Sequence, residues 1–216
     1  MLKTNLLAWV SLSIVVCNLY LLGTGRLTAM IRGVAAQGLL LSVLPLLLPD
    51  SPGAVHTVIL VAMSAAIKGI AIPKFLFRAL RGVEATRETN VAVGPSLSVS
   101  FGLLVTAFAF YAAHNLNLSS ALVSPYHVSS AIATAAIGLF LIVTRRSVVG
   151  QVIGYLVFEN SAFILGLSIA AFQPLLIELG VLLDMLVGVF IMVIAVHYIH
   201  AEHDTIAIES LERLVR

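Results

Sequence analysis

Charge and cysteine are both scarce in this sequence. Only 10% of its 216 residues are charged, whereas soluble domains carry roughly 25%. The single cysteine, Cys17, cannot form a disulfide within the chain or a cysteine zinc cluster, so we interpret it as a small buried hydrophobic residue. The formal net charge of +2 gives no basic excess for nucleic acid. Phosphate-binding, haem-attachment and serine-nucleophile motifs are also missing, so we predict no catalytic, cofactor or metal site.

Hydrophobic residues, by contrast, make up 60% of the chain, and the mean hydropathy is +1.09. A helix needs about 20 apolar residues to cross the hydrocarbon core of a bilayer. The segments that meet this requirement are 5–23, 28–48, 55–77, 93–113, 125–144, 148–171 and 174–199. The first could be mistaken for a signal peptide, but another apolar segment follows at once, which favours a retained helix. We therefore predict an all-α, polytopic membrane protein with about seven transmembrane helices.

The basic residues lie in alternate connections between these segments. The connections at 49–54, 114–124 and 172–173 contain no Lys or Arg. The other connections and the tail hold Arg26, Arg32, Lys74, Arg78, Arg81, Arg87, Arg145, Arg146, Arg213 and Arg216. Because basic loops stay in the cytoplasm, we predict that the N-terminus is outside and the C-terminus cytoplasmic, in the cell inner membrane.

The predicted helices fall into two groups. Residues 1–120 would form an N-terminal bundle of four helices, residues 121–200 a three-helix unit, and residues 201–216 a cytoplasmic tail. Helices one to three and five to seven share an orientation, which is typical of a parallel internal repeat. The side chains of these two triplets are only weakly similar, so the sequence leaves open whether the triplets are a true repeat.

Two carboxylic acids lie deep inside predicted spans. An ionised group at the centre of a membrane helix costs at least about 2.5 kcal/mol, so it usually has a partner or a function. At 1.5 Å per residue, Glu159 lies roughly 18 Å from the cytoplasmic end of helix six, and Asp184 roughly 15 Å from the outer end of helix seven. Both depths are near the midplane. Two carboxyls held together away from water are suited to hold and pass a proton.

Lys68 is the third buried charge, roughly 20 Å from the outer face. Pro73 follows five residues later, and we expect it to break or kink the helix and to free carbonyls that accept hydrogen bonds from Lys68. A desolvated lysine can also exchange protons. Structural alternatives stay open: Glu159 and Asp184 could pair across helices without an ion path, and Lys68 could snorkel to the cytoplasmic surface.

Weaker candidates complete the set of possible relay residues. Glu178 lies near the outer end of helix seven, where an interfacial group is also expected, and His127 at the outer start of helix five could line a proton exit.

Other polar residues of the spans are not relay candidates. Gln37, in the middle of helix two, is expected to form a hydrogen bond across helices. Three histidines share one face where helix seven leaves the membrane, and we interpret them as solvated rather than metal-binding: His197, His200 and His203.

Residues 136–214 resemble the K subunit of respiratory complex I and the C subunit of multisubunit cation/proton antiporters. The matching arginine turn is IGLFLIVTRRSVVG, the helix with a buried glutamate is VIGYLVFENSAF, and the second acid stands in DMLVG as Asp184, before Gly188. The tail segment IAIESLERL also fits. Glu159 lies about one turn, or about 5 Å, later than in that pattern, and Asp184 replaces a glutamate.

With its N-terminal extension, the whole chain is similar to hydrogenase-4 component E, a membrane subunit of group 4 nickel-iron hydrogenase and formate hydrogenlyase complexes. The resemblance implies a non-redox subunit that moves protons or sodium ions through a midplane relay of Glu159, Asp184 and Lys68. The implied partners are antiporter-like subunits and the other membrane subunits of a nickel-iron hydrogenase, which would hold the metals. Two alternatives are a membrane anchor or assembly subunit of the same complex without an ion path, and a free-standing secondary transporter.

Overall fold

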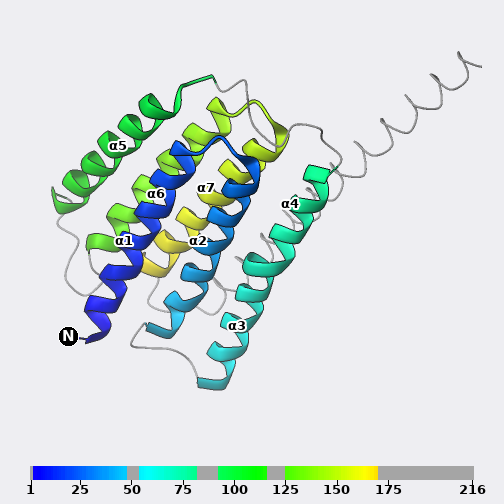
Figure 1. The fold of residues 1–216 in the computed structure, drawn as a ribbon. Coiled ribbons are helices and arrows are strands. Elements are labelled where there is room, and N and C mark those ends of the chain that lie inside the picture. The colour runs from blue at the N-terminus through cyan, green and yellow to red at the C-terminus, as the bar shows by residue number, and fades with distance from the viewer. Residues whose placement is uncertain (1, 48–53, 82–91, 116–124, 170–216) are drawn as a thin grey trace, which may run out of the picture.

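The computed structural model describes residues 2–47, 54–81, 92–115 and 125–169, and every element in these ranges is a helix. The helices lie side by side as a bundle (Figure 1). The seventh predicted span, the tail, Asp184 and Glu178 lie outside the described residues. The domain boundary predicted near residue 120 lies outside them as well.

Most of the predicted spans correspond to single observed helices. These are α1 (Leu2–Gly23), α2 (Leu27–Leu47), α5 (Pro95–Asn115), α6 (Pro125–Thr144) and α7 (Val148–Ile169). Each is long and apolar enough to cross a membrane. The part of the chain that the structure describes therefore contains five candidate membrane spans.

The third predicted span, 55–77, is a helix in three parts. α3 (Ala54–Ala66) is followed by a π-helical turn, η1 (Ile67–Ala71), and then by α4 (Ile72–Arg81). Of the break or kink expected at Pro73, the break does not occur, because the helix continues to Arg81 and its winding changes in the turn before the proline. A proline has no N–H, and its ring presses on the carbonyl four residues earlier in an α-helix. The wider π turn relieves this conflict without ending the helix.

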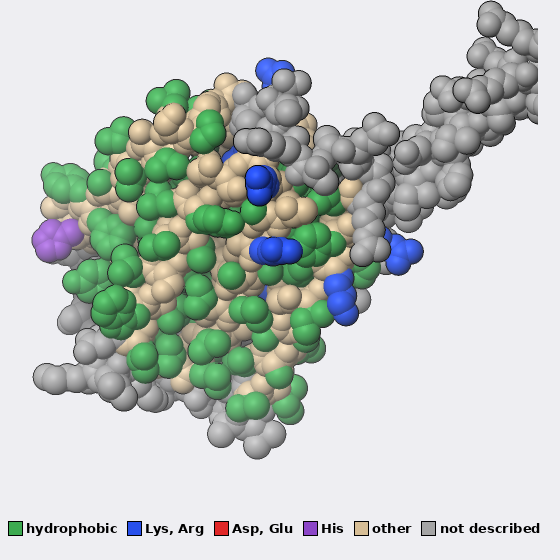
Figure 2. Space-filling view, viewed as in Figure 1, with side chains coloured by type: hydrophobic (Ala, Val, Ile, Leu, Met, Phe, Trp, Pro, Cys, Tyr) green, Lys and Arg blue, Asp and Glu red, His purple; other side chains and the backbone are tan. Residues whose placement is uncertain are grey.

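Four helices form the centre of the bundle. α6 packs along α7, α1 contacts both α2 and α6, and α2 contacts α7. α5 lies against α1 and α6 on one side, while α3, η1 and α4 lie against α2 on the other (Figure 1). Figure 2 shows hydrophobic side chains over most of one face of the molecule, which suits a surface in contact with lipid.

One end of the bundle is basic, and we call it the basic end. α1 and α6 both finish there, and it carries Arg26, Arg145 and Arg146. In Figure 2, Lys and Arg side chains gather in the half of the visible face toward this end. We call the other end, at which α1 and α6 begin, the opposite end.

Two hydrophobic clusters fill the bundle. The cluster nearer the basic end has among its buried side chains Leu21, Leu22, Ile31, Leu76, Ile137, Leu141 and Ile153. The cluster nearer the opposite end contains Ile14, Leu41, Leu44, Ala131, Phe163, Ile164 and Leu167. Each of the four central helices contributes to both clusters, so its apolar face is interrupted between them.

Glycine lets α6 and α7 approach closely. A Cβ atom added to Gly138 of α6 would lie 2.6 Å from the backbone nitrogen of Phe158, and one added to Gly154 of α7 would lie 2.7 Å from the backbone nitrogen of Ile142. Both distances are shorter than real side chains allow, and the atoms in the way belong to backbone. Small residues are the usual means of close packing between membrane helices, and here they join the longest contact of the bundle.

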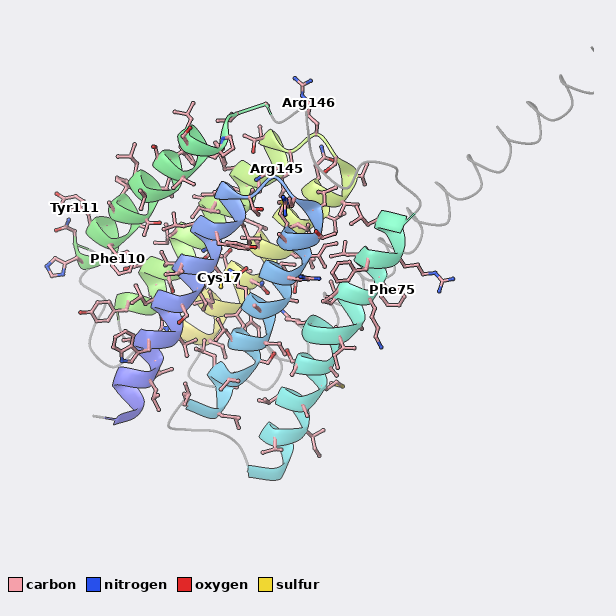
Figure 3. The ribbon with its side chains drawn as sticks, in the orientation of Figure 1. Cys17, Phe75, Phe110, Tyr111, Arg145 and Arg146 are labelled. Atoms are coloured by element: carbon pink, nitrogen blue, oxygen red, sulfur yellow. The ribbon has the colours of Figure 1, made fainter. Side chains whose placement is uncertain are left out.

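Arg145 caps the C-terminal end of α1. It is only 3% exposed, and its Nη2 donates to the carbonyl oxygens of Leu21 and Thr24 at 3.0 Å each and of Leu22 at 3.4 Å. The last carbonyls of a helix have no partner within it, and a positive charge suits that end. Figure 3 shows Arg145 turned toward the bundle and Arg146 turned away from it. Arg145 is thus a buried cap as well as a charge of the basic end.

We expect Gly138→Ala to weaken the α6–α7 contact, because the new methyl group meets the backbone of Phe158. Overpacking of this kind costs about 1–3 kcal/mol, so the melting temperature of the purified protein in detergent should fall by several degrees. Gly94→Ala is the matched control, since a Cβ atom there has nothing within 4 Å. Equal melting temperatures for the two variants would contradict the close contact.

We expect Arg145→Gln to destabilise the protein by about 1–3 kcal/mol, because the carbonyls at the end of α1 lose a charged donor. Arg146→Gln removes the same charge from the exposed neighbour and should change stability by no more than about 0.5 kcal/mol. Thermal unfolding in detergent, followed by circular dichroism, compares the two. A loss of the same size in both variants would mean that the cap does not contribute.

Candidate functional site

A layer of polar side chains separates the two hydrophobic clusters. Its six members, which we call the polar layer, are all buried: Asn18 of α1, Gln37 of α2, Lys68 of η1, Thr134 of α6, and Glu159 and Asn160 of α7. Gln37 lies ten residues from each end of α2, and Glu159 lies ten residues before the end of α7. The layer therefore lies half-way along helices that are long enough to span a membrane.

Lys68 and Glu159 form the charged part of the layer. Lys68 Nζ lies 3.4 Å from Glu159 Oε1 and donates a shorter hydrogen bond, of 3.0 Å, to Asn160 Oδ1. Nζ also lies 5.2 Å from the ring centroid of Phe163, a cation–π distance. Lys68 is only 6% exposed, so it does not snorkel to the surface. The ammonium is instead held by successive residues of α7.

The π turn and a glycine together place Lys68. The N–H of Ile72 bonds to the carbonyl of Ile67, five residues earlier, so the helix is wider where Lys68 leaves it. On the facing helix, a Cβ atom at Gly38 would lie 2.7 Å from Cβ of Lys68, and only glycine allows this approach. The sequence predicted backbone carbonyls near Pro73 as acceptors for Lys68, whereas the structure gives it partners across the bundle on α7. π turns within α-helices often mark functional sites.

Amide side chains carry the layer across the bundle. Asn160 Nδ2 donates to Gln37 Oε1 at 3.5 Å, and Gln37 Nε2 donates to Asn18 Oδ1 at 2.9 Å. Asn18 Nδ2 then donates to Thr134 Oγ1 at 2.7 Å, and that hydroxyl donates to the backbone carbonyl of Ser130 at 2.6 Å. Every donor in this chain points away from the ammonium and toward α6. Aligned hydrogen bonds of this kind polarise and strengthen one another.

A small cavity lies beside the charged pair. It has a volume of about 10 Å³ and is lined by Val34, Gly38, Lys68, Ile72, Leu156 and Asn160. A space of this size holds about one water molecule, and two of its lining residues are polar enough to bind one. The site therefore combines a cation, a carboxylate and room for water at mid-depth, which are the components of a proton-exchange site. Within the described residues, no three His, Cys, Asp or Glu side chains are grouped as metal ligands would be.

The structure brings some of the predicted site residues together and separates others. Glu159 and Lys68 meet, and the prediction of a cross-helix hydrogen bond for Gln37 is confirmed. His127 does not join the polar layer; its Nδ1 lies 2.7 Å from Ser11 Oγ, closer to the opposite end. The acid predicted beside Glu159, Asp184, lies outside the described residues, so that pairing stays a prediction.

The amide and hydroxyl members of the layer were missed as site residues. Asn18, Thr134 and Asn160 carry no charge, so the cost of burying an ion does not single them out in the sequence. The sequence does hold a signal, because Asn18 in IVVCNLYLL and Thr134 in IATAAIG each stand among apolar residues in the middle of a span, and Asn160 directly follows Glu159. A polar group buried in this way needs a hydrogen-bond partner, and the nearest partners are on neighbouring helices.

The sequence is similar to two groups of known proteins. It is 33% identical over 171 residues to the uncharacterized protein Rv0085 of Mycobacterium tuberculosis, and the match covers 76% of each chain. It is 23% identical over 147 residues to hydrogenase-4 component E of Escherichia coli K12 and of Shigella flexneri, with 68% of each chain covered. No family model matches the sequence, and no solved structure matches it.

A double-mutant cycle tests the Lys68–Glu159 pair. Lys68→Met and Glu159→Gln should each lower stability by about 3–5 kcal/mol, because each leaves the other charge buried without its counter-ion. The double variant carries neither charge and should recover most of this loss, as measured by thermal unfolding in detergent. Lys74→Met removes an exposed lysine six residues further on and should cost no more than about 0.5 kcal/mol. Additive losses in the double variant would mean that the two groups do not interact.

Proposed function

Because the chain belongs to the same family as the Mycobacterium tuberculosis protein Rv0085 and is also similar to hydrogenase-4 component E, we propose that it is a non-redox membrane subunit of a respiratory-type hydrogenase complex. The five apolar helices among the described residues fit such a subunit. Its partners would be antiporter-like subunits and the other membrane subunits of a nickel-iron hydrogenase. It would lie in the cell inner membrane with its basic end in the cytoplasm.

We further propose that the polar layer takes part in moving protons or sodium ions through this complex. The observation that supports this role is the buried Lys68–Glu159 pair, half-way along the bundle and hydrogen-bonded through Asn160. Ionisable groups at this depth are expensive, and they usually belong to an ion pathway. A structural pair could be replaced by apolar residues of similar size, often at no cost in stability.

The chemistry of the pair suggests how charge movement could be coupled. While Lys68 stays beside Glu159, each buried charge has the other as its counter-ion. If a charge in a partner subunit draws the ammonium away, the carboxylate is left in a nonpolar medium and takes up a proton. The return of Lys68 favours the carboxylate again and releases that proton. The adjacent cavity offers room for the water molecule through which it would move.

Asp184 would extend this relay sideways. The predicted seventh helix follows α7 through a short turn, so it would run antiparallel to α7 with Asp184 near the depth of Glu159. Glu159 and Asp184 would then be neighbouring stations on a path along the membrane plane, with Lys68 at one side. Such a path would connect this subunit with the membrane subunits on either side of it.

A structural role for the same residues is the second candidate, and one observation favours it. The amide chain from Asn160 to Thr134 joins four helices by hydrogen bonds and would hold the bundle together even without ion transport. In that case the protein would be an anchor or assembly subunit of the same complex. Transport per assembled complex separates the two candidates, because loss of a relay residue lowers transport by each complex that assembles, while loss of a structural residue lowers only the amount of complex.

We expect Glu159→Gln to leave hydrogen or formate turnover with artificial electron acceptors largely intact in the complex, while coupled proton transport falls by at least about tenfold. The amide keeps the size of the side chain but cannot give up a proton at this position. Proton uptake by membrane vesicles, measured beside turnover in the same preparation, reports the loss.

Native gels of the same membranes provide the control for assembly, and Lys74→Gln serves as the control for loss of a charge outside the layer. Low transport per assembled complex supports the relay. Unchanged transport per complex in both Glu159→Gln and Asp184→Asn would show that the relay role is wrong, and a low yield of complex with normal transport per complex would favour the anchor.

A further inference from the structure

A second polar contact joins α1 and α6 closer to the opposite end. Ser11 Oγ of α1 lies 2.7 Å from His127 Nδ1 of α6, and both residues are 2% exposed. Asn18 and Thr134, in the polar layer, lie seven residues further along the same two helices. The two contacts therefore repeat after two helical turns on both helices, which run parallel and in register. Between the two contacts α1 buries the apolar Ile14 and Val15, so any further polar side chains on this path come from α6.

Ser130 continues the polar path between the two contacts. Thr134 Oγ1 donates to the carbonyl of Ser130, and Ser130 Oγ donates to the carbonyl of His127 at 2.9 Å. The three residues are buried and follow one another by single turns of α6. Hydroxyl groups can turn, since each has one proton and two lone pairs. Hydroxyls or an imidazole thus occur at every turn from Thr134 to His127.

This polar path reaches the surface near Ser11. A groove of about 270 Å³ lies between α1, α5 and α6, and it is lined by Ala8, Trp9, Ser11, Leu12, Phe110 and Tyr126. Ser11 is the buried polar member of this lining. Phe110, on α5, is labelled in Figure 3, and its ring lies 6.4 Å from that of Tyr126. Ser11 thus joins the open groove to the buried His127.

The imidazole of His127 is suited to pass a proton. Ser11 Oγ has two acceptors within reach, the Leu7 carbonyl at 3.1 Å and His127 Nδ1 at 2.7 Å. When the hydroxyl donates to Leu7, Nδ1 carries the imidazole proton; when it donates to Nδ1, the proton is on Nε2. Nε2 is buried and has no hydrogen-bond partner among the described residues. The contact therefore accommodates both neutral forms of the ring, which differ by the position of one proton.

We propose that the Ser11–His127 and Asn18–Thr134 contacts form an access branch, by which protons move between the polar layer and the face of the membrane at the opposite end. His127 would accept a proton on one ring nitrogen and release one from the other, and Ser130 and Thr134 would relay it with water toward Asn18. This inference rests on the proposed ion path through Lys68 and Glu159. It adds the direction in which that path opens.

The branch is tested by the reactivity of single cysteines in membranes that contain the assembled complex. The sequence has one cysteine, so Cys17→Ala removes the thiol of this subunit, and labelling is measured on this subunit alone. In this background, Ser11→Cys and Thr134→Cys are exposed to a charged, membrane-impermeant methanethiosulfonate added at the opposite end. Ile14→Cys and Ala133→Cys are the controls: both positions are fully buried apolar residues within one helical turn of the positions they match.

We expect the Ser11 and Thr134 variants to react at least about tenfold faster than their controls, because a thiol in a hydrated site ionises more readily than one in apolar surroundings. Equal rates at Thr134→Cys and Ala133→Cys, or reaction only from the basic end, would overturn the branch. If Thr134→Cys does not accumulate in the membrane, Ser130→Cys takes its place with the same control and the same criterion.

The labelling experiment tests the access branch separately from the transport experiment that tests the ion path. Slow labelling combined with loss of transport in Glu159→Gln would leave the relay standing and remove the branch. Fast labelling combined with unchanged transport in Glu159→Gln would show a hydrated path that serves no relay, and would contradict the proposed function instead.

Discussion

Lys68 and Glu159 hold opposite charges 3.4 Å apart in a medium that stabilises neither of them alone. Removing such a pair from water costs several kcal/mol for each ion, and their attraction compensates only when further groups complete the hydrogen bonding. The surroundings meet this requirement. Asn160 and Phe163 hold the ammonium from the side of α7, and Gly38 allows α2 to come within contact of the lysine stem. The π turn before Pro73 aims the lysine inward.

The rest of the bundle is arranged around this pair. Two apolar clusters lie on either side of the polar layer and separate its charges from both ends of the bundle, except along the polar side chains between α1 and α6 that form the proposed access branch. Between them, the amide chain continues the layer across α2, α1 and α6. Because the polar layer lies between apolar clusters, it favours movement of charge along the membrane plane over movement straight across the membrane. This geometry supports a subunit that passes charge between neighbours, and similarity to hydrogenase-4 component E suggests which neighbours these are.

The sequence predicted the helices well because hydrophobic length is a local property. The bounds of α6 were predicted to the residue, and those of α1 and α2 nearly so. The third span was harder, since the consequence of Pro73 depends on whether the chain ends, kinks or widens the helix. Glu159 and Lys68 were identified because buried charge is rare. Their partners were not, because no local pattern shows that Asn160 faces Gln37 or that Asn18 faces Thr134. Arg145 was counted as a loop charge, since its burial depends on α1 ending beside it.

The pairing of α1 with α6 also constrains how the protein is made. Ser11 and Asn18 meet partners that lie 116 residues later in the chain. A ribosome needs on the order of ten seconds to add that many residues. Gln37 follows Asn18 by only 19 residues, so α2 can satisfy one side of its amide early in translation. The final carbonyls of α1 have to wait, in contact with water or the insertion machinery, until Arg145 emerges. α1 therefore enters the membrane before α6 but obtains its last partners only when α6 arrives.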